Sequence, residues 1–265
     1  MDKEKIIEIW NKTSDSDWYK GYRTDSVIIK IIQNPKSTFH HTIWEMLSKN
    51  MPSFKNKKIC IPSSGDNHAA FAFSILGAHV TSCDISPRQL ENAKIIAEKH
   101  HFDIEFICSD TVYLSNLPDG TFDLVFTSNG THVWIDDLRT MYKNISRVLK
   151  NDGMYLMYEI HPFNRPFNDG DPANKKSIGI AKPYDGIGPF GVNYHWRLQD
   201  ILNAVISSSM NITHIEEMFA EYGTYWFESS GERKDMTEKE LRDLYDWQTN
   251  PLAALPQWLG VSARK

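Results

Sequence analysis

Short apolar runs alternate with amphipathic stretches through the middle of the chain, and this alternation predicts an α/β fold. The apolar runs are too short for helices and are typical of buried strands. The predicted strands are 59–61, 78–83, 104–107, 122–127, 154–160, 211–219 and 258–263, and the predicted helices are 69–76, 87–100, 135–149 and 197–208. Strands that alternate with helices in this way form a parallel sheet covered by helices on both faces.

Capping residues fix where two of these helices begin and end. Ser86 and Pro87 precede and open the second helix, because a hydroxyl accepts a hydrogen bond at the N-cap and proline suits the first helical position. Gly77 follows the first helix, where a left-handed residue commonly ends helical structure. Both signals agree with the apolar pattern.

The chain divides into an N-terminal extension, residues 1–52, and a larger unit, residues 53–265, that carries the alternation. Apolar residues at helical spacing predict short helices at 6–10, 26–32 and 38–49 within the extension. We therefore expect helices ahead of the first strand.

Two insertions, near 161–195 and 221–255, interrupt the larger unit. They are rich in turn-forming and polar residues, and loops of this length inside a domain are often functional lids. We expect them to cover a substrate site together with the aromatic segment 18–22. The alternative is that they brace the back of the sheet or form a dimer contact.

Composition narrows the class of protein. The 265-residue chain has a formal net charge of −5 at pH 7 and a pI near 6.1, which opposes the basic surface that nucleic-acid binding normally needs. No apolar run is long enough to cross a bilayer, and the charged N-terminus is unlike a secretory signal. Cys60, Cys83 and Cys108 lack metal-ligand spacing and indicate free thiols. We expect a cytoplasmic protein without a metal site, and the oligomeric state stays open.

Residues 58–84 are the most informative segment. They form a predicted strand–helix–strand unit, with a turn of small residues at 63–67 after the first strand and Asp84 at the end of the second. Such a unit brings a helix N-terminus and an acid to the edge of a sheet where nucleoside cofactors bind. A dinucleotide site would carry G-x-G-x-x-G, but this turn keeps only Gly65, and Asp66 would repel a phosphate. S-adenosylmethionine, which carries no phosphate, matches the turn better.

At this point the chain resembles the class I S-adenosylmethionine-dependent methyltransferases of small-molecule type. The pieces that carry the resemblance are the turn 63–67, GAHVTSCDIS at 77–86, CSD at 108–110, FDLVFTSNG at 122–130 and RVLKNDGMYLMYE at 147–159. The resemblance implies a Rossmann-like doubly wound sheet, mostly parallel with an antiparallel last strand, and helices on both faces.

The turn departs from the family's acid-x-G-x-G-x-G pattern. Ile61 stands at the acid position, and Ser63 and Asn67 stand at two glycine positions. The turn can still form, because asparagine tolerates positive φ and serine is small.

The carboxylate of Asp84 can accept hydrogen bonds from both ribose hydroxyls of a cofactor. The resemblance implies that Asp110 accepts from the adenine amino group and that Asn129 or its backbone contacts the amino-acid part. The full set of expected cofactor-binding residues is Ser63, Ser64, Gly65, Asp66, Asp84, Ile85, Gln89, Ser109, Asp110, Thr111, Ser128 and Asn129.

Histidines and aromatic residues outside the core pattern are candidates for the acceptor pocket. The expected pocket residues are Tyr19, Tyr22, His132, His161 and Tyr194. His132 and His161 are also candidate bases, since an imidazole can take a proton near neutral pH. The alternative for each is ordinary packing.

These features predict an S-adenosylmethionine-dependent methyltransferase that transfers a methyl group to a small-molecule acceptor by direct displacement. The residues would mainly align the reactants and exclude water. Two alternatives stay open: a methyltransferase acting on nucleic acid or protein, and a catalytically silent cofactor-binding scaffold.

Overall fold

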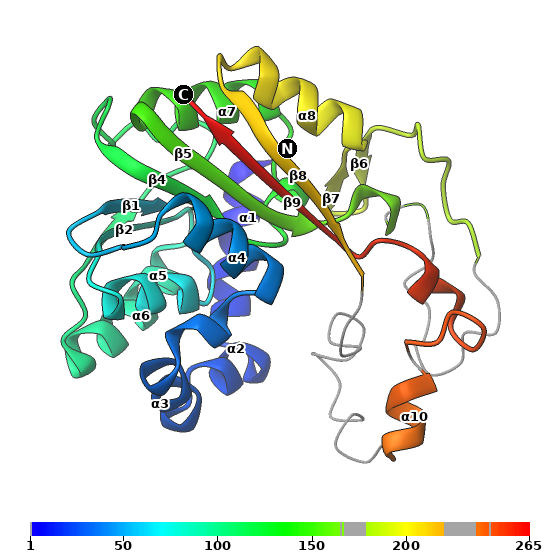
Figure 1. Cartoon of the computed structure of the whole chain (residues 1–265), viewed down its shortest axis with the longest axis horizontal. Coiled ribbons are helices and arrows are strands. Elements are labelled where there is room, and N and C mark those ends of the chain that lie inside the picture. Colours follow the sequence, from blue (N-terminus) through cyan, green and yellow to red (C-terminus); the bar gives the residue numbers. More distant parts are fainter. Residues whose placement is uncertain (1, 165, 167–178, 220–236, 244) are drawn as a thin grey trace.

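The structure is a computed structural model, and it describes residues 2–164, 166, 179–219, 237–243 and 245–265 (Figure 1). Its helices are α1 (Lys3–Ser14), α2 (Asp17–Tyr22), α3 (Asp25–Gln33), α4 (His41–Asn50), α5 (His68–Ile75), α6 (Pro87–His100), α7 (Leu138–Val148), α8 (Leu198–Ser207) and α10 (Glu238–Asp243). The strands are β1 (Lys58–Ile61), β2 (His79–Asp84), β3 (Ile104–Cys108), β4 (Phe122–Thr127), β5 (Leu149–Ile160), β6 (Gly188–Phe190), β7 (Asn193–His195), β8 (Asn211–Met218) and β9 (Trp258–Arg264). Single 3-10 turns are η1 (Pro35–Thr38), η2 (His132–Trp134), η3 (Pro162–Asn164) and η6 (Pro251–Ala254).

One seven-stranded sheet organises the molecule, in the order β3-β2-β1-β4-β5-β9-β8. Neighbouring strands from β3 to β5 pair in parallel, whereas β9 runs antiparallel between β5 and β8. Figure 1 shows helices on both faces of this sheet. The predicted Rossmann-like sheet with an antiparallel last strand is therefore confirmed. The strand order reverses between β1 and β4, which is where open α/β sheets bind ligands.

Alternate residues of the central strands face two separate cores, because successive side chains of a strand point to opposite sides. Ile59 and Ile61 of β1 pack with residues of α4, α5 and α6, whereas Cys60 packs with residues of α7 and α8. β4 and β5 divide between the two cores in the same way. Burial on both faces explains why these strands read as continuous apolar runs.

The capping signals in the sequence are confirmed. Ser86 Oγ accepts a hydrogen bond from Gln89 N at 3.1 Å, and Pro87 is the first residue of α6. Gly77 follows α5 with φ +89°. α7 begins at Leu138, later than predicted, because Asp137 caps it through Thr140 N at 3.0 Å.

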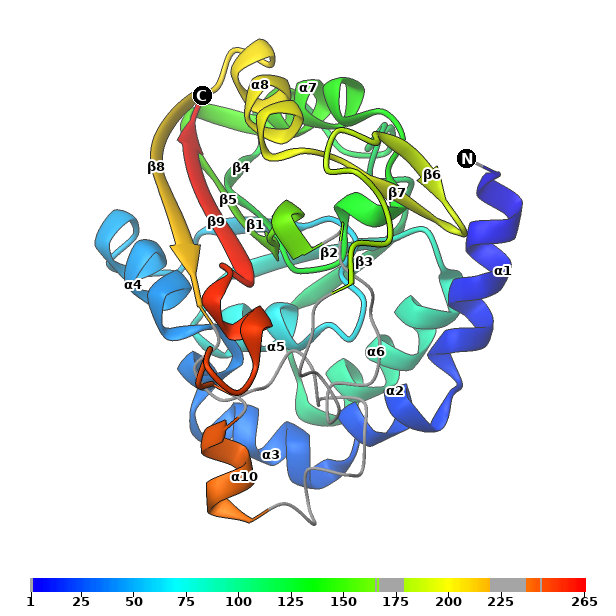
Figure 2. The same ribbon diagram turned by 90° about the vertical axis from the view of Figure 1, so that its right-hand side faces the viewer.

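The four N-terminal helices lie against the sheet's edges and covering helices. Figure 2 shows α1 beside α6, and α4 on the other side of the molecule beside β8 and β9. α4 approaches β9 closely at Gly260, where an added Cβ would lie 3.0 Å from Ile43 Cδ1 and 3.3 Å from Met46 Sδ. The missing side chain of Gly260 is thus what allows α4 to pack on β9.

This packing predicts that Gly260→Val lowers the free energy of unfolding by about 1–3 kcal/mol, the usual cost of overpacking a core. Gly260→Ala should cost less, and both are measured by urea unfolding. Gly21→Ala is the control, since an added Cβ there meets nothing within 4 Å. A Gly260→Val protein as stable as the wild type would contradict this account.

Candidate functional site

A cavity of about 740 Å³ opens at the carboxyl edge of the parallel strands. The loops that follow β1, β2, β3 and β4 line it, together with residues of β5, α1, α2 and the η1–α4 segment. Among the sequence-predicted residues, those that line it are Tyr19, Tyr22, Ser63, Ser64, Gly65, Asp66, Asp84, Ile85, Asp110, Thr111, Ser128 and Asn129. The sheet topology thus brings most of the predicted set into one site.

The turn after β1 has the left-handed backbone conformation that favours glycine, although only one of its residues is a glycine. Ser63, Gly65 and Asn67 all have left-handed φ values, of 52°, 53° and 64°. Asn67 Nδ2 donates to Gly65 O at 2.9 Å, and Ser63 Oγ lies 2.8 Å from Thr111 Oγ1. Side-chain hydrogen bonds therefore hold the conformation at the two positions where serine and asparagine replace glycine.

Asp84 is the best-anchored residue of the site. It is 6% exposed, and its carboxylate accepts hydrogen bonds from Gly65 N at 3.0 Å and Ser86 N at 2.9 Å. Burial raises the pKa of Asp84 above its ordinary value, while the bonds from Ser86 and Gly65 oppose that rise. Since a carboxylate offers about four acceptor positions, two remain for a ligand's hydroxyl groups.

Asp110, at the end of β3, is held from two sides. Its Oδ1 accepts from Val112 N at 2.8 Å, and its Oδ2 lies 2.5 Å from Lys3 Nζ of α1. Neighbouring Ser109 is buried, and its backbone N donates to Asp84 O at 3.0 Å. Ser109 therefore joins two walls of the cavity without lining it.

The loop after β4 is anchored by Glu159 of β5, which is 2% exposed. Its carboxylate accepts from Gly130 N at 2.6 Å, His132 N at 2.9 Å and Ile160 N at 2.8 Å. This loop presents Ser128 to the cavity. Glu159 is therefore a main-chain anchor, a role that sequence reasoning missed.

Gln89, which the resemblance places at the adenine, is not among the described residues that line the cavity. It is fully buried between α6 and the N-terminal helices, where its Oε1 accepts from Arg23 and from Ser14 Oγ. Gln89 therefore joins α6 to α1 and α2.

The histidine candidates and Tyr194 are not among the described residues that line the cavity. His132 is buried, with Nε2 2.8 Å from Tyr142 Oη. His161 is buried 2.9 Å from Glu217, and burial lowers its pKa although Glu217 acts in the opposite direction. Tyr194 packs on Trp196 with ring centroids 4.6 Å apart. Each of these three side chains thus contacts a partner that is not among the described residues lining the cavity.

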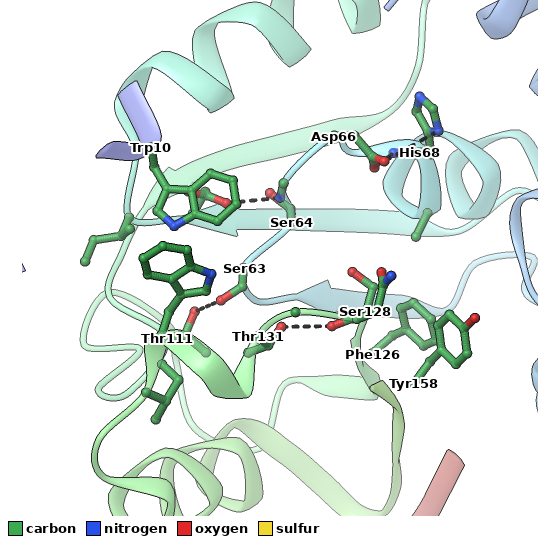
Figure 3. Close-up of a pocket in the computed structure, with 18 of the residues that line it drawn as sticks. Trp10, Ser63, Ser64, Asp66, His68, Thr111, Phe126, Ser128, Thr131 and Tyr158 are labelled. Carbon is green, nitrogen blue, oxygen red and sulfur yellow. Dashed lines mark hydrogen bonds and ion pairs between the residues drawn. The ribbon is translucent and has the colours of Figure 1, made fainter. Parts of the chain in front are cut away.

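The sequence did not predict that aromatic side chains gather at one end of the cavity. We define the aromatic end as Phe39, His40, His68, Phe126, Tyr158 and Trp258, all of which line the cavity. Tyr158 and Trp258 have ring centroids 5.0 Å apart, and Phe39 and Phe126 5.7 Å. Figure 3 shows Phe126, Tyr158 and His68 at one end of the cavity, and Trp10 and Thr111 at the other. The aromatic end joins strands to the η1–α4 segment, so no local pattern reveals it.

The insertions contribute little to the cavity wall as far as the structure describes them. Within the described parts of 161–195 and 221–255, no residue lines the cavity. Residues 165, 167–178, 221–236 and 244 lie outside the described residues. The lid stays a prediction, while Trp18, Tyr19 and Tyr22 line the cavity as expected.

No described helix is long and apolar enough to span a membrane. In the same part of the chain, no group of three His, Cys, Asp or Glu side chains is arranged to hold a metal ion.

The role of Glu159 predicts that Glu159→Gln lowers the free energy of unfolding by about 1–3 kcal/mol, because the amide leaves a buried loop N–H without an acceptor. Urea unfolding measures the loss. Glu45→Gln is the control, since Glu45 is exposed on α4. Equal stability of the two variants would show that Glu159 does not anchor the loop.

The segment that carries most of this site is similar to known methyltransferases. The family model described as "Methyltransferase domain" matches residues 62–157. The chain is 29% identical over 157 residues to a sterol 24-C-methyltransferase of Gibberella zeae, covering 57% of this chain and 39% of that protein. It is 27% identical over 139 residues to an uncharacterized methyltransferase of Bacillus subtilis, covering 51% and 54%. The chain thus spans about half or less of the length of these curated relatives.

Solved structures share the fold. An S-adenosylmethionine dependent methyltransferase from Mesorhizobium loti superimposes with a TM-score of 0.61 at 22% identity, over 84% of this chain and 97% of that one. A geranyl diphosphate C-methyltransferase from Streptomyces coelicolor, solved with S-adenosyl-L-homocysteine, gives a TM-score of 0.63 at 13% identity, over 99% and 97%. The match at residues 62–157 and the shared fold support a class I S-adenosylmethionine-dependent methyltransferase with S-adenosylmethionine as its cofactor.

Proposed function

We propose that the chain transfers the methyl group of S-adenosylmethionine to a small, largely apolar acceptor. The observation that carries this proposal is one cavity that combines the fixed carboxylates of Asp84 and Asp110 with the aromatic end. The names of relatives that act on a sterol and on geranyl diphosphate support a small-molecule acceptor.

The residues fit the cofactor by their donor and acceptor chemistry. Asp84 keeps two acceptor positions for ribose hydroxyls after its bonds to Gly65 N and Ser86 N. Asp110 offers acceptors to an amino group, and the turn 63–67 brings backbone groups to the cavity without a phosphate site. The bound cofactor supplies an electrophilic methyl group on a sulfonium.

The aromatic end supports an apolar acceptor. Apolar walls with a few polar groups are typical of small-molecule pockets. Aromatic faces also attract cationic groups, which suits a sulfonium beside the acceptor. In this proposal, the chain's residues align the acceptor with the methyl group and exclude water, and direct displacement needs no further group from the protein.

We also propose that the acceptor is not a nucleic acid and that the protein is cytoplasmic. The acidic net charge supports an acceptor other than nucleic acid. The free thiols Cys60, Cys83 and Cys108 support a cytoplasmic location.

The proposal is tested by incubating the full chain with methyl-labelled S-adenosylmethionine and separated metabolite, RNA and protein fractions. We expect label in an extractable small molecule. Label in RNA or protein would replace this proposal with its alternative. Failure to bind S-adenosylhomocysteine, or tighter binding of NAD in a parallel calorimetric titration, would overturn the cofactor assignment.

Asp84→Asn should weaken S-adenosylhomocysteine binding about tenfold or more, because hydrogen bonds to a charged group are worth roughly 1.5–3 kcal/mol each. Calorimetry measures the change. Glu45→Gln again serves as the control, since Glu45 is exposed and is not among the described residues that line the cavity. Unchanged affinity in Asp84→Asn would remove Asp84 from the site.

Affinity should also depend on pH through Asp84. Burial raises the pKa of Asp84, and only the ionised carboxylate accepts two hydroxyl hydrogen bonds. Affinity should therefore fall as pH is lowered through this raised pKa, beginning at a higher pH than for an ordinary aspartate. Titrations at a series of pH values measure this. If the affinity of Asp84→Asn depends on pH in the same way, a group other than Asp84 is responsible for the pH dependence.

A further inference from the structure

We define the adenine end of the cavity as the part lined by Trp10, Asp110 and Thr111. We propose that Lys3 of α1 is a positioning and specificity residue of this end, where it holds Asp110 in place to accept a hydrogen bond from the 6-amino group of adenine. This inference rests on the proposed function, because it requires that the cavity bind an adenosyl cofactor. It adds to the site a residue that lies outside the segment matched by the family model, 62–157.

The contacts of Lys3 give the first argument. Lys3 Nζ lies 2.5 Å from Asp110 Oδ2 and 4.1 Å from the centroid of the Tyr113 ring. The other carboxylate oxygen, Oδ1, accepts from Val112 N at 2.8 Å. Asp110 is therefore fixed through both oxygens, one by its own loop and one by a helix more than a hundred residues away in the sequence.

The orientation of α1 gives the second argument. Lys3, Ile6 and Trp10 all line the cavity, and their spacing of three and four residues puts them on one face of the helix. Trp10 also meets Trp134 of η2, with ring centroids 5.2 Å apart in an edge-to-face arrangement. Figure 3 places Trp10 at the same end of the cavity as Thr111, the neighbour of Asp110. One face of α1 is thus a wall of the adenine end.

Other residues hold α1 in place independently of Lys3. Asn11 Oδ1 accepts from Ser86 Oγ at 2.7 Å, and Asp15 lies 2.9 Å from Arg88 Nε. Ser14 Oγ bonds Gln89 Oε1 at 3.2 Å. These contacts fasten α1 to α6, as the neighbouring helices in Figure 2 also show. Replacing Lys3 should therefore leave α1 docked.

The Lys3–Asp110 pair predicts selectivity for a 6-amino purine over a 6-oxo purine. A carboxylate only accepts hydrogen bonds, so it favours a 6-amino purine and opposes a 6-oxo purine, which presents an acceptor. After the bonds to Val112 and Lys3, about two acceptor positions of Asp110 remain for the amino group. Without Lys3, one oxygen is free to turn toward water, and recognition of the amino group weakens.

The test compares S-adenosylhomocysteine with S-inosylhomocysteine, its 6-oxo counterpart, by calorimetry on full-length variants. Lys3→Met should weaken S-adenosylhomocysteine binding about two- to fivefold, the range for a partly exposed ion pair, and leave S-inosylhomocysteine nearly unchanged. Lys3→Glu should weaken it further, because two carboxylates repel. Lys5→Met is the matched control: it has the same charge change on the same helix, and Lys5 is exposed and not among the described lining residues.

A double-mutant cycle completes the test, since coupled residues give non-additive effects. In an Asp110→Asn background, Lys3→Met should have no further effect on affinity. An equal loss for both ligands, an effect that persists without Asp110, or the same loss in Lys5→Met would overturn the inference. A wild-type chain that binds neither ligand would instead remove the proposed function on which the inference rests.

Discussion

The site depends on buried carboxylates that hold main-chain loops. Asp84 at the end of β2 accepts from Gly65 N in the turn after the neighbouring strand β1. Glu159 near the end of β5 accepts from Gly130 N and His132 N in the loop after the neighbouring strand β4. The two anchors lie on either side of the point where the strand order reverses. Because a buried charge is costly unless it is hydrogen-bonded, each anchor fixes its loop in one conformation.

This arrangement explains how the turn after β1 works with so few glycines. Three of its residues have left-handed φ, yet only Gly65 is a glycine. Asn67 bonds across the turn and to β2, and Ser63 bonds to Thr111 of the loop after β3. Hydrogen bonds from polar side chains thus stabilise the left-handed backbone that glycines usually allow. The same hydrogen bonds also link the turn to β2 and to the loop after β3.

The fold was predictable from the sequence because its signals are local. Strand–helix alternation, the cap at Ser86 and Gly77 all depend on residues close together in the chain. The site was predictable only in part. Asp84 follows from its place at a strand end, but Lys3 meets Asp110 only through tertiary packing, and Gln89 was expected at the cofactor although α1 and α2 bury it. The sequence alone could not separate a structural from a catalytic role for His132 and His161, since the same side chain serves in both.

Hydrogen exchange of the full chain with and without S-adenosylhomocysteine tests the central claim most directly. The account predicts that ligand slows exchange of backbone amides in the turn 63–67 and in the loops 84–86, 110–112 and 128–131, which line or anchor one cavity. It predicts no change in the exchange rates of amides in α8, which packs on α7 and contributes no residue to the cavity wall. Binding without protection of these loops, or protection centred on α8, would contradict the account.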